Sequence, residues 1–126
     1  MIFDTDVLIW AQRGNARAVE AALDCENPQV SAQTYMELLQ SAQNGRQQDQ
    51  IKEFLHDSGF SVLPLSENIG HRACVYIEQY SLAHGLRAGD ALVAATAAEH
   101  DEALLSGNLK HFKCIRELKL TVFVPE

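Results

Sequence analysis

The sequence predicts an α/β fold, a three-layer sandwich in which a five-stranded parallel sheet lies between helices. Short apolar segments with strand character alternate along the chain with segments of helical periodicity, and this alternation is typical of a parallel sheet. One predicted helix, 89–99, is rich in alanine and nearly apolar all round, which indicates burial on both faces. The length of 126 residues is that of one domain, so we expect a single domain over residues 1–126.

The first thirty residues are predicted to form a strand, two helices and a second strand. The apolar segment 1–3 is the first strand, and it runs into a helix that the polar residues 13–15 stop. Asn15 is expected to cap the second helix, 16–23, because its side chain can accept a hydrogen bond from a free backbone N–H. Beyond an Asn-Pro break, the second strand covers 29–31.

The third predicted helix follows the second strand directly, and two residues can cap it. Ser31 is one candidate N-cap, and Thr34 is the other. Thr34 and Glu37 have the spacing of a capping box, in which each side chain bonds to the other's backbone. We expect Gly45 to end this helix.

The central part of the chain is predicted to hold a helix, a strand and the longest helix. A helix over 47–55 precedes a third strand at 60–64. Ser66 is expected to cap a helix that extends to about residue 83 and ends at Gly85. The last two predicted strands are 103–106 and 121–124.

The composition limits the possible functions. The net charge is −7 and the pI is near 5.1, which argues against broad, non-specific adhesion to nucleic acid. A nuclease remains compatible, because a divalent metal would offset a cluster of carboxylates. No leader pattern and no long apolar run are present, so we expect a cytoplasmic protein without membrane contact. The three cysteines have no metal-binding spacing and are expected to be buried, reduced side chains.

Two aspartates follow the first predicted strand. Asp4 stands where this strand ends, and ligands of open parallel sheets bind beyond the carboxyl ends of the strands. An aspartate at this position favours an open cleft or a bound cation over capping alone. Asp6 comes two residues later, and alternation along an extended chain places it on the same side. Its place at a helix start also permits a role as a cap.

Two further acids are weaker candidates when they are taken singly. Glu37 fits the capping box, and Asp90 fits a first-turn acid that the helix dipole favours. Together with Asp4 they offer the oxygen ligands that Mg²⁺ or Mn²⁺ prefers, and such a metal polarises a phosphodiester and activates water. The scattered histidines lack zinc spacing, and the chain has no glycine-rich phosphate loop.

Three segments, MIFDTDVLIW, VSAQTYMELLQSAQ and HGLRAGDALVAATAAEHDEALLSGNLKHF, together with the closing strand, resemble the PIN-domain family and its VapC toxins in particular. The similarity runs nearly end to end, is weakest over 45–65, and is most specific in LRAGDALVAATA. The resemblance implies a five-stranded parallel α/β/α sandwich and Mg²⁺- or Mn²⁺-dependent cleavage of RNA. It also implies inhibition by a cognate antitoxin protein, commonly with toxin homodimers in the complex.

The resemblance also implies a set of site residues. Asp4, Glu37 and Asp90 match three acidic residues of the family's active site. Many relatives have a fourth acid where this chain has Asn108, whose amide oxygen can hold a metal-bound water without adding charge. Asp6 is the obvious substitute for that missing ligand.

Three residues near Asn108 are candidate substrate contacts. Ser106 can orient a carboxylate or a phosphate by hydrogen bonding. Lys110 or Lys113 can contact the phosphates of the scissile strand, because exposed basic residues are few in this acidic chain.

Two other functions remain open on the sequence alone. Asp4 and Asp6 also have the spacing of the nucleophile pair in haloacid-dehalogenase-type phosphatases, where Asp4 would form an aspartyl-phosphate. The chain is short for that core, and Lys110 lacks the adjacent acidic pair that such enzymes carry. The second alternative is a non-catalytic PIN-fold binding module, which the missing fourth acid and the net charge favour.

Overall fold

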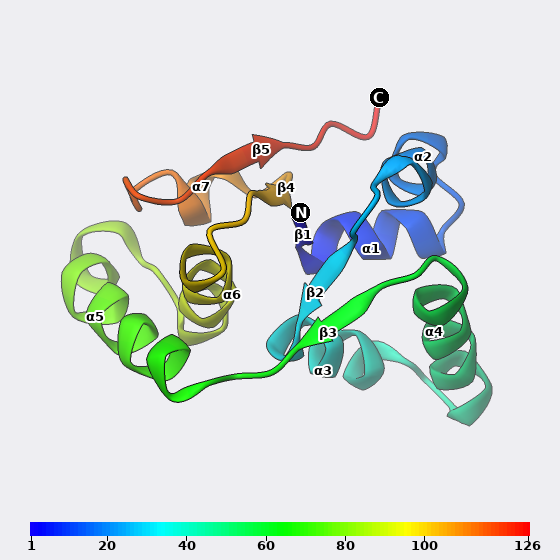
Figure 1. Cartoon of the computed structure of the whole chain (residues 1–126), viewed down its shortest axis with the longest axis horizontal. Helices are drawn as coiled ribbons and strands as arrows, with labels where there is room; N and C mark the ends of the chain where they lie inside the picture. Colours follow the sequence, from blue (N-terminus) through cyan, green and yellow to red (C-terminus); the bar gives the residue numbers. More distant parts are fainter.

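The computed structural model describes all 126 residues, and a five-stranded parallel sheet lies at its centre (Figure 1). The strand order is β3-β2-β1-β4-β5, so the chain builds the sheet outward from β1 first on one side and then on the other. The order reverses beside β1, which is where open sheets of this kind bind ligands. The strands are β1 (Ile2–Phe3), β2 (Gln29–Ser31), β3 (Ser61–Leu63), β4 (Leu104–Ser106) and β5 (Leu120–Val122).

Helices cover both faces of the sheet, as predicted. They are α1 (Thr5–Gln12), α2 (Ala16–Asp24), α3 (Ala32–Ser41), α4 (Gly45–Asp57), α5 (Glu67–His84), α6 (Ala88–Glu99) and α7 (Leu109–Phe112). Because side chains alternate along a strand, Ile2 and Leu104 pack against α5, α6 and α7. Phe3 and Leu105 pack against α1, α2, α3 and α4 on the opposite face. The predicted three-layer α/β/α sandwich is therefore confirmed.

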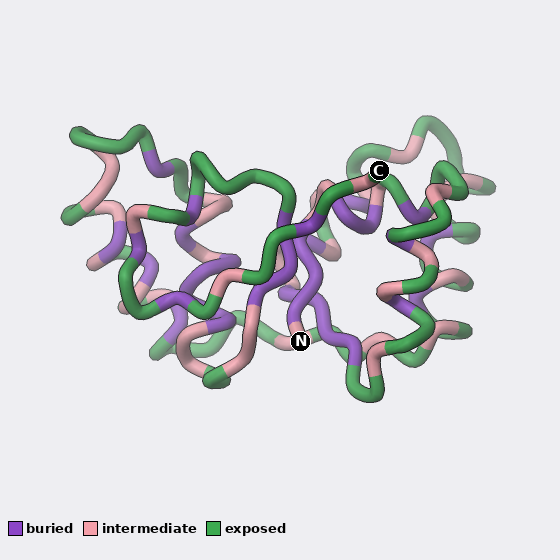
Figure 2. Tube along the Cα trace, turned by 90° about the horizontal axis from the view of Figure 1, so that it is seen from above, coloured by how far each residue is buried: buried purple, intermediate pink, exposed green.

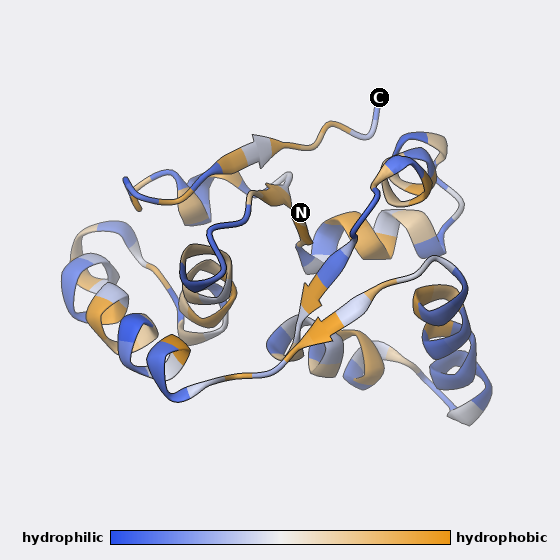
Figure 3. Cartoon of the chain, viewed as in Figure 1, coloured by the Kyte–Doolittle hydropathy of each residue, from blue (hydrophilic) through white to orange (hydrophobic).

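The apolar residues concentrate between these layers. Figure 2 shows that buried backbone runs through the central strands, while the outer helices carry most of the exposed positions. Helix α6 is the most deeply buried helix, and five of its residues from Ala91 to Ala97 are fully covered alanines or Thr96, as its apolar sequence predicts. Helix α4 is hydrophilic on its outer turns (Figure 3).

Three predicted helix caps are confirmed. The side chain of Asn15 accepts a hydrogen bond from the backbone N–H of Ala18 at 3.0 Å and begins α2. Ser66 accepts from the N–H of Ile69 at 3.2 Å and begins α5. Gly85 ends α5 in the left-handed conformation, with φ of 69°, where a glycine avoids the steric cost of a Cβ.

The boundaries of α3 and α4 differ from the prediction. Ser31 caps α3, and its hydroxyl accepts from the N–H of Thr34 at 3.0 Å, so Thr34 lies inside the helix and is not a cap. The predicted capping box with Glu37 is therefore wrong. Gly45 does not end α3 but begins α4, because Asn44 supplies a side-chain cap just before it.

Two other features depart from expectation. The sequence did not predict α7, whose four residues are too few to show helical periodicity. Cys74 is exposed and Cys25 and Cys114 are only partly covered, so the expected burial of the cysteines is wrong. No helix in the structure is both long and apolar enough to cross a membrane.

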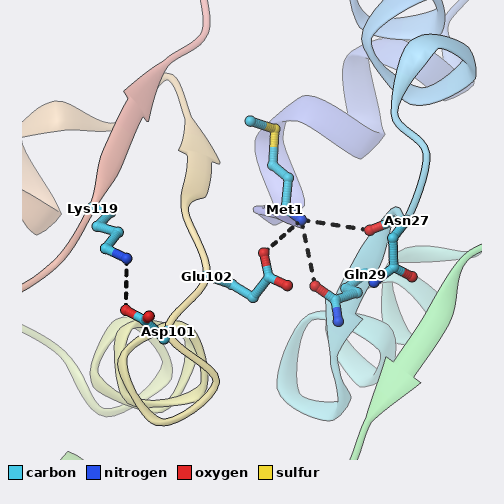
Figure 4. Close-up of polar contacts among 6 residues, drawn as sticks. All are labelled: Met1, Asn27, Gln29, Asp101, Glu102 and Lys119. Atoms are coloured by element: carbon cyan, nitrogen blue, oxygen red, sulfur yellow. Dashed lines mark hydrogen bonds and ion pairs between the residues drawn. The ribbon is translucent and has the colours of Figure 1, made fainter.

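Polar contacts hold the edge of the sheet where the strands begin (Figure 4). The amino group of Met1 bonds to the carboxylate of Glu102 at 2.9 Å, which joins the start of β1 to the loop before β4. Lys119 bonds to Asp101 at 2.6 Å and joins the start of β5 to the same loop. These contacts lie at the edge of the sheet opposite to the strand ends.

Candidate active site

Asp4 lies at the carboxyl end of β1 and is almost fully buried, with 6% exposure. It is the N-cap residue of α1, and one carboxylate oxygen accepts from the N–H of Thr5 at 2.8 Å. The other oxygen accepts from the hydroxyl of Ser106 at 2.8 Å, at the end of β4. The pKa of Asp4 is raised to about 6, chiefly by burial and also by the nearby charges of Asp6 and Asp90, while the hydrogen bonds from Ser106 and Thr5 act in the opposite direction.

Asp6 lies in the first turn of α1, because the helix begins at Thr5. The expected strand-like alternation with Asp4 is therefore wrong, although the two carboxylates remain close enough to interact. One oxygen of Asp6 accepts from the N–H of Gly107 at 2.9 Å, and the other is buried without a partner. Burial raises its pKa. A Cβ at Gly107 would lie 2.7 Å from the Asp6 carboxylate, so a side chain at this position would displace that carboxylate from its present contact.

Glu37 lies in the middle of α3 and faces the start of α6. Its carboxylate accepts from the side-chain amide of Gln33 at 2.9 Å and from the hydroxyl of Thr5 at 3.2 Å. A Cβ added at Gly89 would lie 3.4 Å from a Glu37 oxygen, which places Glu37 directly beside the first turn of α6. These contacts orient Glu37 towards the site instead of towards the N-terminus of its own helix.

Asp90 lies in the first turn of α6, where Arg87 is the N-cap and makes no side-chain capping bond. Burial raises the pKa of Asp90, and the charge of Glu37 raises it as well, while His111 and Arg87 lower it. The ring of His111 lies 3.4 Å from the Asp90 carboxylate. The sequence did not predict this contact, although His111 lies three residues after Asn108.

Acids from α1, α3 and α6 therefore gather at the strand ends beside β1 and β4. No three His, Cys, Asp or Glu side chains converge closely enough in this structure to form a ready metal site. The donors nevertheless fit a hard divalent cation, because all are oxygens and one buried Asp6 oxygen lacks any partner. A cation would also relieve the burial and mutual repulsion that raise the pKa values of Asp4 and Asp90.

Comparison with known proteins assigns this arrangement to a family. The family model for the PIN domain matches residues 1–117. The chain belongs to the PIN domain family. No curated protein matches the sequence. The predicted resemblance is thereby confirmed, and the haloacid dehalogenase alternative loses its support.

Several solved structures are similar to this PIN domain over nearly its whole length. A toxin–antitoxin complex from Klebsiella pneumoniae is 27% identical with a TM-score of 0.79, over 99% of this chain and 97% of that chain. FitAcB from Neisseria gonorrhoeae is 28% identical with a TM-score of 0.69. The match covers 98% of this chain and 96% of that chain. VapBC-1 from nontypeable Haemophilus influenzae is 22% identical and shares the fold, with a TM-score of 0.77. The match covers 97% of this chain and 98% of that chain.

The segment after β4 lies at the rim of this PIN domain's site. Ser106 is fully buried. It was predicted to orient a carboxylate or a phosphate, and the structure shows its hydrogen bond to the carboxylate of Asp4. Its oxygen also accepts from the N–H of Asn108 at 3.0 Å, while the Asn108 side chain is exposed and makes no capping bond. Lys110 and Lys113 are exposed on and after α7.

Proposed function

We propose that this PIN domain, acting as one unit over residues 1–126, is the VapC-type toxin of a toxin–antitoxin pair and a metal-dependent endoribonuclease of the cytoplasm. One observation carries this proposal. Asp4, Glu37 and Asp90 come from three separate elements and face one edge of the sheet, where the charge of Asp90 raises the pKa of Asp4 and the charge of Glu37 raises the pKa of Asp90. Such crowding of carboxylates is costly for folding and is retained where a cation and a substrate bind.

In the proposed mechanism a bound Mg²⁺ or Mn²⁺ would act as a Lewis acid that polarises the phosphodiester of the RNA and activates a water molecule. The chain's own residues set the geometry. Asp4, Glu37 and Asp90 would hold the metal, with Asp6 and Asn108 as further oxygen donors. Ser106 fixes the rotation of the Asp4 carboxylate, Gln33 and Thr5 fix Glu37, and the amide of Gly107 fixes Asp6. Lys110 and Lys113 are exposed at the rim, where they can contact RNA phosphates.

Thermal unfolding tests metal binding without any RNA. Millimolar Mn²⁺ or Mg²⁺ should raise the melting temperature of the unmodified protein, because a ligand stabilises the state that binds it by about 2.7 kcal/mol at a hundred times its Kd. Asp90→Asn should lose most of this shift, and Asn108→Asp should enlarge it by adding a charge. Asp49→Asn, an exposed aspartate on α4, is the matched control and should keep the full shift. Equal shifts in all four proteins would contradict a metal site at these acids.

Two hollows outside the acidic site support a protein partner and a pairing of toxins. Between α1, α3 and α4 lies a groove of about 400 Å³, with Ile9, Leu38 and Ile51 in its lining. An apolar helix of an antitoxin fits such a groove. We also propose a homodimer, for which an apolar hollow of about 510 Å³ between α5 and α6 offers a face.

The antitoxin should insert an arginine or lysine towards Asp4 and Asp90. A guanidinium binds carboxylates bidentately, so it would satisfy the buried acids in the absence of metal. Removing one partner of a buried charge pair costs about 2 kcal/mol or more, so Asp90→Asn should weaken antitoxin binding by about 30-fold or more in a titration. Asp49→Asn should leave it unchanged. An inhibited complex in which both carboxylates stay open to solvent would overturn this expectation.

A further inference from the structure

Positive charge in this chain is concentrated in one segment. Residues 107–119 hold four Lys or Arg residues and one acid, a net charge of +3 in a chain whose total is −7. The rest of the protein therefore carries −10. Such a separation of charge produces a local field that attracts a polyanion, although the whole molecule repels one.

The segment exposes its cations because a buried apolar residue at every third position anchors it to the core. Phe112, Ile115 and Leu118 are buried in the core formed with α5 and α6. The basic residues recur with the same spacing of three and face solvent, and they are Lys110, Lys113, Arg116 and Lys119. Lys119 pairs with Asp101, whereas Lys110, Lys113 and Arg116 pair with no carboxylate. We call these three unpaired cations the basic ridge.

The basic ridge starts at the candidate active site and leads away from it. At one end, Gly107 bonds to Asp6 and His111 lies 3.4 Å from Asp90. At the other end, Arg116 lines a cavity of about 560 Å³ between α5 and the loop that precedes β5. The ridge therefore leads from the acids at the strand ends towards a second hollow, which is lined by one face of α5. The chain between α7 and β5, which carries the ridge, lies beside α5 and α6 (Figure 1).

This second hollow has the lining of a site for an unpaired base. Tyr80 offers an aromatic ring, Asn68 and Gln79 offer amide groups, and Arg116 offers a cation. Glu99 and Glu117 also line the hollow, and both carboxylates are paired with Arg72. Its volume lies within the range of about 300–1,000 Å³ that is typical of small-ligand pockets. Proteins that hold single-stranded nucleic acid combine a cationic track for the backbone with aromatic rings on which bases stack.

We propose that the basic ridge binds the backbone of single-stranded RNA beyond the cleavage point, and that the hollow at Tyr80 receives one of its bases. This inference rests on the proposed function and adds to it a preference for long, unpaired RNA. The ridge carries the attraction for phosphates, which explains how an acidic protein holds a polyanion. The hollow adds a contact that depends on a base being free to stack.

Binding of labelled single-stranded RNA, measured without metal, tests the ridge. The protein should bind an oligonucleotide of about 20 nucleotides at least about tenfold more tightly than one of about 4, because only the longer strand reaches the hollow. The double variant Lys113→Ala/Arg116→Ala should lose this length preference. It should also lower the slope of log affinity against log salt by about 1.4, or 0.7 for each lost phosphate contact.

A stacking contact is distinguished by its salt dependence. Tyr80→Leu should weaken binding of the long strand by about tenfold with no change in the salt slope, since it removes no charge. The control double variant Arg46→Ala/Lys52→Ala on α4 removes the same charge elsewhere and should keep both the length preference and the slope. Melting temperatures confirm that each variant is folded.

Three results would overturn the inference. One is an unchanged length preference in Lys113→Ala/Arg116→Ala, and another is an equal loss in the α4 control. The third is competition by polyglutamate as strong as that by RNA of equal charge, which would assign the ridge to an acidic protein segment instead. Failure of the unmodified protein to cleave RNA would refute the proposed function separately, because these affinities are measured without cleavage.

Discussion

Neutralising Asp4 should leave the protein at least as stable as before while cleavage of RNA is lost. Burial raises the pKa of Asp4 from its ordinary value of 3.8 to about 6, so ionisation at neutral pH opposes folding by about 3 kcal/mol at most. In Asp4→Asn the amide oxygen can still accept from Thr5, and Ser106 can still accept from the amide. We therefore expect unchanged or higher stability, and a loss of activity of about a hundredfold or more.

The contribution of Asp4 to the free energy of unfolding should decrease as pH rises. The folded protein holds this proton up to about pH 6, whereas the unfolded chain releases it near pH 3.8. The contribution of Asp4 to stability therefore falls as pH rises from about 4 to 6, and it stays constant above that range. Unfolding by denaturant across this range should show the decline in the unmodified protein and in Asp49→Asn. A decline of the same size in Asp4→Asn would assign it to another group.

Placing a charge inside α6 should prevent folding. Ala94 and Ala95 are fully buried between the sheet and the neighbouring helices, and no cation lies in their core cluster. An unpaired aspartate at either position costs several kcal/mol, which is a large part of the stability of a typical domain. Ala94→Asp and Ala95→Asp should therefore give insoluble protein or protein without a cooperative melting transition.

The matched control is Ala16→Asp, which adds the same side chain at the exposed first position of α2. Here the new carboxylate stays in water and the helix dipole favours it, so solubility and melting should be preserved. Normal melting of Ala94→Asp would mean that α6 is not the central buried helix. The same result for Ala95→Asp would strengthen that conclusion, because the two residues point to different neighbours around the helix.

The sequence was sufficient to predict the sheet, its parallel direction and most helix starts, because these depend on local patterns. The spacing of apolar residues predicts the strands. The hydrogen-bonding and conformational preferences of single residues predict the helix caps at Asn15 and Ser66 and the end of α5 at Gly85. The start of α3 was less certain, because Ser31 and Thr34 both offer suitable hydroxyls and only packing decides between them. Helix α7 could not be predicted, since one turn of helix leaves no periodic signal.

Only part of the candidate site could be predicted, because local patterns reveal some of its residues and tertiary packing determines the others. Asp4 is placed by the end of its strand, which a local pattern reveals. The role of Glu37 depends on the packing of α3 beside α6, and the spacing with Thr34 pointed instead to a local cap. The contact between His111 and Asp90 joins segments that are far apart in sequence. Without knowledge of the fold, nothing about His111 distinguishes it from the other histidines.

The most direct test of the proposed function is cleavage of RNA by the purified protein, with and without divalent metal. The account predicts that Mn²⁺ or Mg²⁺ supports cleavage, that a chelator abolishes it, and that Asp90→Asn purified in parallel lacks it. Asp49→Asn should cut at the normal rate and so exclude an effect of charge alone. If the folded, unmodified protein cuts no RNA with either metal, it is a non-catalytic binding module. If Asp4→Asn, Glu37→Gln and Asp90→Asn all cut at the normal rate, the assignment of these acids is wrong.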